Sequence, residues 1–345
     1  MLDNLLSEVD VQHLCTLLDK AHNIIVTCHV SPDGDAMGAV LAFSHFLWRK
    51  GKNAQPVVPN IFPDFLKWMP GVERVRIYEK HENEVAPLVA AADLIICLDF
   101  NSPDRLQGLQ KPVTDSQSPK IMIDHHLDPV DFCDWVVSRQ EMSSTCELLY
   151  RILVQLEGLD PMTYEEAVCL YTGMMTDTGC FSYNSNRSDI YYIIGRLLTK
   201  GIDKDKIYRN VFFNYSAERF RLMGYMLYAK LEYFPEYHAS LMTLTREEQK
   251  RFSHKKGDTE GFVNIPLQIG KSRLSVFLRE DTERHNIRVS LRSVDDFPCN
   301  RMAAEFFNGG GHLNASGGEL SCTMDEAVQI VRKALKKYAS LLTDR

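Results

Sequence analysis

The first half of the chain alternates short apolar runs with longer stretches in which apolar residues recur at helical spacing. Continuous runs rich in β-branched residues predict buried strands at 24–28, 94–98 and 121–123. Residues 36–50 follow a helical period, and Ser144 with Glu147 has the spacing of a capping box that opens a further helix. Strands that alternate with helices indicate a mostly parallel sheet flanked by helices, so the predicted fold class is α/β.

The pattern changes in the second half. Residues 204–230 are helical in pattern and rich in Tyr, Phe and Arg, whereas strands are predicted at 239–244, 273–278 and 287–291. Capping-box spacing predicts helices that begin near Thr245 and Thr323. We therefore expect a first domain over 1–200, a helical linker over 201–230 and a smaller α/β domain over 231–345.

The composition of the chain limits the kinds of partner and the cellular location that we expect. The net charge of −7 disfavours a protein that coats long duplex nucleic acid, although it allows a pocket for a small phosphorylated ligand. The sequence shows no signal peptide and no apolar stretch of roughly 20 residues, so we expect no membrane association. The nine cysteines are scattered without a C-x-x-C pair, which predicts free thiols in a reducing compartment and hence a cytoplasmic protein.

Acidic and imidazole side chains gather where the predicted strands of the first domain end. They follow the first strand, close the second and third strands, or follow a helix-like run at 167–175. The residues are His29, Asp33, Asp35, Asp99, Asp124, His125, His126 and Asp177. Parallel strands deliver their carboxyl ends to one edge of a sheet, where ligands bind, so we expect these side chains to meet there.

This set of side chains has a definite metal preference. Carboxylates and imidazoles without thiolates suit Mn²⁺ or Mg²⁺, and the imidazoles favour Mn²⁺. Two such ions about 3.5–4 Å apart can clamp a phosphate and activate water. A single Asp at a strand end is more often a turn or cap residue, but that explanation does not account for three strand ends together. The sequence therefore predicts two Mn²⁺ ions per subunit, with Mg²⁺ as the alternative.

The same residues lie in motifs that resemble those of the DHH phosphoesterase family, in family order. The motifs are HVSPDGDAMG at 29–38, LDFNSPDRL at 98–106, IDHH at 123–126 and DTGCF at 177–181. SLRS at 290–293 and GGGHLNASGG at 309–318 resemble the DHH-associated domain of the nanoRNase and oligoribonuclease/pAp-phosphatase branch. The resemblance covers nearly the whole chain and makes 1–200 the metal-binding catalytic domain and 231–345 the substrate-binding domain.

The resemblance implies a role for each residue. One manganese would be held by His29, Asp33 and Asp99. The other would be held by Asp35, His125 and Asp177, with Asp99 bridging the two. His126 would contact the scissile phosphate and protonate the leaving group, and Asp124 would orient the histidines from behind.

The second domain carries candidates for substrate binding. Successive N–H groups at 309–311, Gly310 and Gly311 among them, predict an anion-binding nest. His312 and Arg292 would add contacts to a phosphate or base, and Ser293 belongs to the same motif. A glycine-rich turn alone is weak evidence, since most such turns are simply loops.

We expect a 3′-5′ exonuclease of short oligoribonucleotides that also acts on 3′-phosphoadenosine 5′-phosphate. Cyclic or linear dinucleotide phosphodiesterase activity is one alternative, and exopolyphosphatase or pyrophosphatase activity on the same metals is another. A non-catalytic nucleotide sensor is a third, disfavoured by the complete ligand set. The expected partners are short oligonucleotides or phosphorylated nucleotides, and the oligomeric state is left open, with a homodimer as one option.

Overall fold

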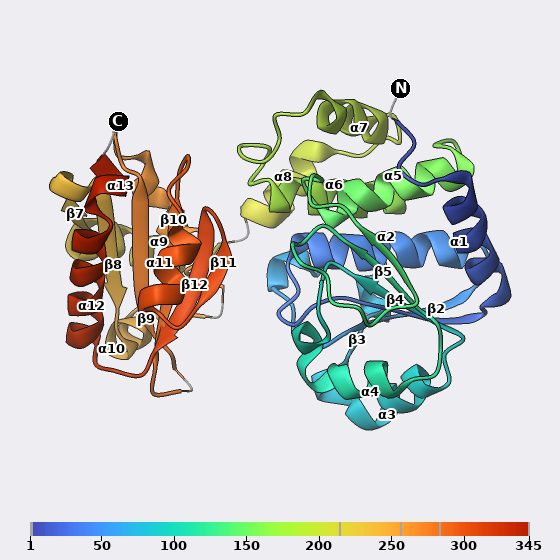
Figure 1. The fold of residues 1–345 in the computed structure, drawn as a ribbon, viewed down its shortest axis with the longest axis horizontal. Helices are drawn as coiled ribbons and strands as arrows, with labels where there is room; N and C mark the ends of the chain where they lie inside the picture. The colour runs from blue at the N-terminus through green and yellow to red at the C-terminus, as the bar shows by residue number, and fades with distance from the viewer. Residues whose placement is uncertain (1–2, 214, 256, 283, 344–345) are drawn as a thin grey trace. The chain divides into compact units, whose positions relative to one another are not determined.

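The computed structural model describes residues 3–213, 215–255, 257–282 and 284–343. The chain divides into two compact units, Met1–Asn214 and Tyr215–Arg345 (Figure 1). Within the described part of the chain, no helix combines the length and the hydrophobicity that crossing a bilayer requires. All nine cysteines are described, and each is a free thiol.

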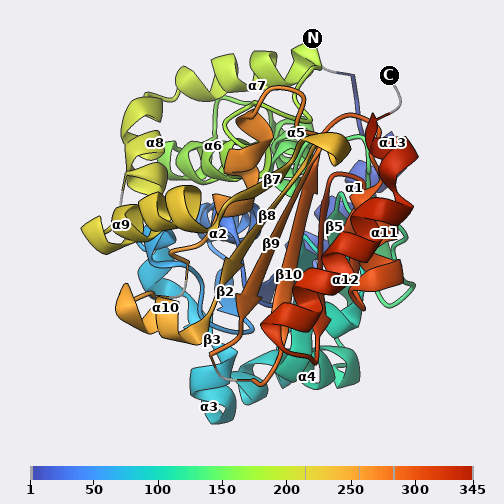
Figure 2. The ribbon, with the colours of Figure 1, turned by 90° about the vertical axis from the view of Figure 1, so that its left-hand side faces the viewer.

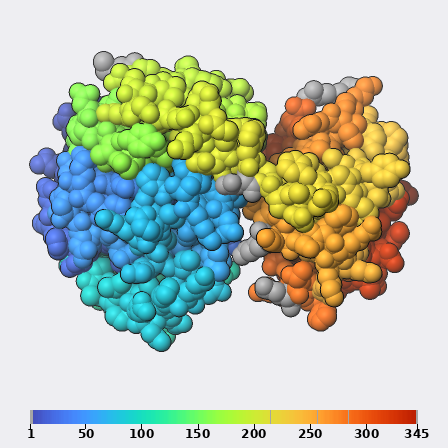
Figure 3. Space-filling model, turned by 180° about the vertical axis from the view of Figure 1, so that it is seen from behind, coloured from blue at the N-terminus to red at the C-terminus, as the bar shows by residue number. Residues whose placement is uncertain are grey.

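The segment 201–230, predicted to be a linker, is instead divided between the two units. Helix α8 (Lys204–Phe212) buries Ile207 and Val211 in the core of the first unit. Helix α9 (Ala217–Tyr225) and the π-helical turn Met226–Lys230 bury Leu222 and Met226 in the second. In the space-filling view, the yellow-green surface of the first unit includes α7 and α8 (Figure 3). The prediction was wrong because an amphipathic pattern shows that a helix buries one face, but not which core receives it.

The first unit is built on a six-stranded sheet in which every pair of neighbours is parallel. Its strands are β1 (Asn23–Thr27), β2 (Asn53–Val58), β3 (Arg76–Ile77), β4 (Leu94–Leu98), β5 (Lys120–Asp124) and β6 (Trp135–Ser138). This sheet confirms the predicted α/β class, and β1, β4 and β5 are the three strands expected from the apolar runs.

Helices cover both faces of this sheet because both faces are apolar. Ile24 and Val26 of β1 belong to the core on one side, which also includes residues of α1 (Glu8–Lys20), α2 (Gly34–Arg49), α5 (Thr145–Glu157), α6 (Tyr164–Asp177) and α7 (Ser188–Leu198). Ile25 packs on the other side, against α3 (Tyr78–Ala90) and the 3₁₀ turn Pro103–Leu109 with α4 (Gln110–Asp115). Figure 1 shows these two layers on either side of the strands.

The strand order β3-β2-β1-β4-β5-β6 reverses direction between β1 and β4. In open parallel sheets, a ligand crevice forms outside the carboxyl ends at such a switch point. Helix α6 comes close to this point because residue 173 is glycine: a Cβ there would lie 2.7 Å from Asp35 Oδ1 and 2.2 Å from Cys146 Sγ. The packing of α6 therefore requires a residue without a side chain.

Helix α5 begins as predicted, but its cap is assembled differently. The Ser144 hydroxyl accepts a hydrogen bond from the Glu147 N–H, as in a capping box. The Glu147 carboxylate, however, accepts from the Ser143 N–H rather than returning to Ser144. The Glu147 carboxylate thus binds the backbone N–H one residue upstream of the one that a capping box would use.

The second unit contains a mixed sheet with the order β11-β12-β10-β9-β8-β7. Its strands are β7 (Glu232–Phe234), β8 (Ala239–Leu244), β9 (Leu274–Glu280), β10 (Ile287–Ser293), β11 (Gly310–His312) and β12 (Ala315–Leu320). Neighbouring strands are antiparallel except for the parallel pair β8 and β9.

Helices flank this sheet as well. Figure 2 shows α11 (Cys299–Phe306) and α12 (Met324–Lys337) on one side, and α9 with α10 (Arg246–Arg251) on the other. Helices α10 and α12 begin with the capping boxes predicted at Thr245 and Thr323. A short helix α13 (Ala339–Thr343) ends the described part of the chain.

Candidate metal centre

Three overlapping groups of possible metal ligands meet at the carboxyl edge of the first sheet. The first group is His29, Asp33 and Asp99, and the second is Asp35, His125 and Asp177. The third, Asp99, His125 and His126, shares Asp99 with the first and His125 with the second. Within each group, one ligand atom of each residue lies within 4.8 Å of the others. The structure thus brings together side chains from four separate segments of the chain: two strand ends, the β1–α2 connection with the first turn of α2, and the end of α6.

Asp99 joins the first and second groups. Its Oδ2 lies 3.4 Å from His29 Nε2, and its Oδ1 lies 3.7 Å from His125 Nε2. The residue is only 2% exposed and has a left-handed backbone, with φ at +64°. One carboxylate therefore faces both groups, which is the geometry that a shared ligand requires.

His29 and His125 both present Nε2 to the centre. His29 Nδ1 donates to the Val30 carbonyl at 2.8 Å, and His125 Nδ1 donates to the Met142 carbonyl at 3.2 Å. Because a carbonyl oxygen can only accept, Nδ1 must carry the proton in both rings. Each Nε2 is left facing the carboxylates, in the orientation that a metal ligand needs.

His126 is held by Asp124. Its Nδ1 lies 2.7 Å from Asp124 Oδ1, and its backbone N–H donates to the other oxygen of the same carboxylate. Asp124 is fully buried, whereas the His126 ring is partly exposed. Among the hydrogen bonds described, Asp124 thus orients His126, while His125 is oriented by the Met142 carbonyl instead.

The centre concentrates negative charge in a buried place. Burial and the nearby Asp99 and Asp177 raise the pKa of Asp35 well above its usual range. Burial opposes protonation of His29, but a hydrogen bond to Asp99 and the charge of Asp33 outweigh it and raise the pKa of His29 to about 9. Buried carboxylates that repel one another in this way would be relieved by a divalent cation, so the donor set fits a metal.

The groups that hydrogen-bond to these ligands were not predicted from the sequence. Asp35 accepts from the N–H groups of Thr145 and Cys146, at 2.6 and 2.9 Å, and Asp99 Oδ1 accepts from the Thr145 hydroxyl at 2.8 Å. A signal was available, because the cap at Ser144 marks a helix N-terminus whose free N–H groups attract carboxylates.

In the second unit, the predicted anion-binding nest is not formed. Gly310 and Gly311 lie in strand β11, paired with β12, and the Gly309 N–H donates to the Ala303 carbonyl. A Cβ on Gly309 would lie 1.9 Å from the Gly317 carbonyl oxygen. The glycines thus allow two backbone segments to approach each other closely. Their spacing in the sequence does not distinguish this arrangement from a nest.

Arg292 and His312 nevertheless share one rung of the second sheet. Both are in register with Ala315, Arg292 from β10 and His312 from β11. Residues directly opposite each other point to the same face of a sheet, so the two long side chains flank a small one. The third candidate, Ser293, is buried and donates its hydroxyl to the Phe297 carbonyl.

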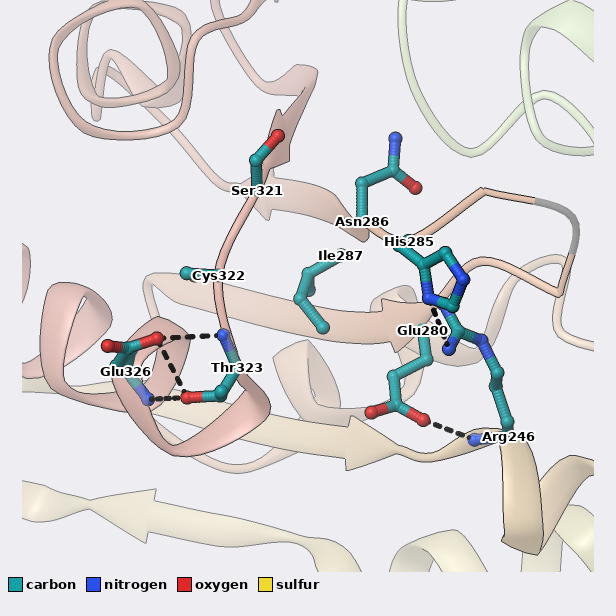
Figure 4. Close-up of a pocket in the computed structure, with 9 residues that line it drawn as sticks. All are labelled: Arg246, Glu280, His285, Asn286, Ile287, Ser321, Cys322, Thr323 and Glu326. Carbon is teal, nitrogen blue, oxygen red and sulfur yellow. Dashed lines mark hydrogen bonds between the residues drawn. The ribbon is translucent and has the colours of Figure 1, made fainter.

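A pocket of the second unit is shown in Figure 4, but its charged side chains are hydrogen-bonded to backbone groups and to Thr323. Glu280 accepts from the Arg246 N–H, and the Arg246 guanidinium donates to the Asp281 carbonyl. Glu326 accepts from Thr323 in the capping box of α12. These contacts stabilise local structure, so we assign no chemistry to this pocket.

A parallel sheet that carries a buried Asp and His cluster at its switch point, followed by a mixed-sheet unit, defines a hydrolase of phosphate esters. The chain belongs to the DHH family: residues 23–174 match the model of the DHH family N-terminal domain, and residues 242–340 match the DHHA1 domain. Both parts of the resemblance seen in the motifs are confirmed.

Several known proteins are similar to this chain. An exopolyphosphatase-related protein from Bacteroides fragilis is 50% identical, with a TM-score of 0.96 over 99% of this chain and 100% of its own. The Thermus thermophilus bifunctional oligoribonuclease and PAP phosphatase NrnA is 29% identical over 315 residues, 91% of this chain and 89% of that protein. RecJ from Thermus thermophilus in complex with Mn²⁺ shares the fold, with 15% identity and a TM-score of 0.55 over 99% of this chain and 56% of its own.

Proposed function

We propose that this chain is a manganese-dependent enzyme that hydrolyses short oligoribonucleotides from the 3′ end and also acts on 3′-phosphoadenosine 5′-phosphate. The observation that carries the proposal is the pair of ligand groups that share Asp99. The substrate class is supported by the similarity to NrnA, which extends over both units.

His29, Asp33 and Asp99 would hold one ion, and Asp35, His125 and Asp177 would hold the other. Bound ions of this kind supply Lewis-acid polarisation of the phosphoryl group and lower the pKa of an attacking water.

The remaining side chains of the centre would act on the leaving group. His126 presents Nε2, because its Nδ1 is hydrogen-bonded to Asp124. A proton held at Nε2 can be delivered to the leaving oxygen as the ester bond breaks. Asp124 would then act by keeping this ring in one orientation.

The second unit would hold the nucleotide end of the substrate. Arg292 offers a planar donor fork, and His312 offers a ring for hydrogen bonding or stacking, on one face of the sheet with Ala315 between them. The small residue leaves space between the two longer side chains. We propose that this pair of side chains makes nucleotides better substrates than simple phosphate esters.

Polyphosphate hydrolysis is the second candidate, because the Bacteroides fragilis protein with 50% identity is described as exopolyphosphatase-related. Hydrolysis of cyclic or linear dinucleotides would use the same ligands.

A product screen separates these candidates. The protein with Mn²⁺ should be offered a labelled ribodinucleotide, 3′-phosphoadenosine 5′-phosphate, a cyclic dinucleotide and polyphosphate, with products resolved by chromatography. We expect mononucleotide from the first substrate and adenosine 5′-phosphate from the second. Release of phosphate from polyphosphate alone would replace the nucleotide proposal, and no product from any substrate would favour a nucleotide sensor.

A further inference from the structure

The hydroxyl of Thr145 contacts the carboxylate that joins the two ligand groups. Thr145 Oγ1 donates to Asp99 Oδ1 at 2.8 Å, and this oxygen is also the one nearer His125. Thr145 is fully buried at the first residue of α5, and its β-branched side chain has few rotamers. The hydroxyl can therefore fix the rotation of the Asp99 carboxylate without competition from solvent.

The same short segment, 142–147, reaches the other ligands through its backbone. The Met142 carbonyl accepts from His125 Nδ1, and the N–H groups of Thr145 and Cys146 donate to the two oxygens of Asp35. One six-residue stretch thus contacts two ligands of the second group, His125 and Asp35, and the Asp99 carboxylate that the two groups share.

A buried ionic cluster anchors this segment at its far end. The Glu147 carboxylate is completely buried and accepts from the N–H and the hydroxyl of Ser143. Arg151 and Arg187 both donate to it, at 2.9 and 2.5 Å. Two cations around one buried carboxylate give strong, directional hydrogen bonds, so the segment is held on both sides of Thr145.

The geometry points to Thr145 as a positioning residue for the metal centre, acting through its hydroxyl on Asp99. This inference rests on the metal centre proposed above. Without the hydroxyl, the buried carboxylate loses a donor and can rotate away from the orientation in which its two oxygens face different groups. Loss of a partner that orients a metal ligand typically weakens metal binding by about 10- to 100-fold.

The test compares Thr145→Val with Thr145→Ser. Valine keeps the shape and the backbone N–H that Asp35 uses but removes the hydroxyl, whereas serine keeps the hydroxyl. Mn²⁺ affinity measured by calorimetry should fall by about tenfold or more in the Val variant and stay within about threefold of the wild type in the Ser variant. The kcat at non-saturating Mn²⁺ should follow the same order, with the KM for substrate unchanged.

Thr172→Val is the matched control. Thr172 is also fully buried, but its hydroxyl donates to the Val168 carbonyl within α6. An equal loss of Mn²⁺ affinity in this control, or wild-type affinity in Thr145→Val, would overturn the inference. If Thr145→Val does not fold, as judged by circular dichroism, Thr145→Ala is measured in its place. A wild-type protein that binds no Mn²⁺ would instead refute the proposed centre itself.

Discussion

The two units of this chain hold their polar groups in opposite ways. In the first, the candidate ligands are mostly buried at the switch point of the sheet, and Asp35 and Asp99 are 1% and 2% exposed. In the second, His312 lies exposed on strand β11, and Arg292 is half-buried on the same face of the sheet. The candidate metal ligands, whose geometry must be fixed, are held by hydrogen bonds and by packing. The side chains proposed to bind the substrate lie where a substrate can reach them.

This contrast predicts different consequences for loss of a side chain. Loss of a metal ligand at the edge of the first sheet should abolish chemistry on every substrate. A change on the face of the second sheet should alter which substrate is preferred.

The largest effect is expected for Asp99→Ala. Both ligand groups would lose their shared carboxylate, so hydrolysis of every substrate should fall by about a thousandfold or more, whichever metal is supplied. Initial rates with Mn²⁺ and with Mg²⁺ measure this loss. Asp64→Ala, which removes an exposed carboxylate paired with Lys67, is the control and should behave as the wild type. Near-normal turnover in Asp99→Ala would exclude a shared ligand.

His126→Ala should lower kcat by about a hundredfold on a ribodinucleotide, because the leaving oxygen loses its proton donor. The loss should be much smaller on bis(p-nitrophenyl) phosphate, whose leaving group departs readily as an anion. Steady-state rates on both substrates give the comparison. Equal losses on the two would indicate that His126 acts on binding or on the metals instead.

Metal binding should weaken as the pH falls. His29, whose pKa is raised to about 9, is protonated below that pH and must lose its Nε2 proton to bind a metal. Mn²⁺ affinity should therefore decrease by about tenfold per pH unit between roughly pH 8.5 and 6.5. Calorimetry in buffers of different ionisation enthalpy measures both the affinity and the released proton. A flat profile would show that His29 is not a ligand.

His312→Ala should raise the KM for a ribodinucleotide by about tenfold, from the loss of one stacking or hydrogen-bonding contact. Hydrolysis of bis(p-nitrophenyl) phosphate should be unchanged. His254→Ala, which changes a half-buried histidine elsewhere in the second unit, serves as the comparison. Equal losses on both substrates in His312→Ala would contradict a role in nucleotide recognition.

The smallest effect is expected for Thr323→Ala, which removes the cap of α12. The Tm of the second unit should fall by roughly 4 °C, while Mn²⁺ affinity is unchanged because the ligands belong to the first unit. Thr323→Ser keeps the capping oxygen and should restore the Tm. A change in Mn²⁺ affinity in Thr323→Ala would show that the two units are coupled.

Much of the first unit could be predicted because its signals are local. Strands β1, β4 and β5 are continuous apolar runs, and the acidic and imidazole residues follow them directly. Strand β2 and helix α3 were not predicted; each contains a proline, Pro56 and Pro87, that obscures its pattern.

The other features of the fold and of the site depend on tertiary contacts, which the spacing of apolar residues does not encode. The Met142 carbonyl and the Thr145 hydroxyl reach their ligands only once α5 is packed against the sheet. In the second unit, a run of glycines fits a nest, a loop or a close strand pair equally well. The close approach of Gly309 to Gly317, which decides among them, is a tertiary contact.

The left-handed backbone of Asp99 has a consequence for how this centre can change over evolutionary time. Such a conformation costs an aspartate about 1 kcal/mol and costs glycine almost nothing. A substitution to glycine at this position would ease the backbone, but it would also remove the carboxylate that accepts from the Thr145 hydroxyl and faces His29 and His125. Replacement of this aspartate is therefore opposed by its buried contacts as well as by its proposed role as the ligand that the two groups share.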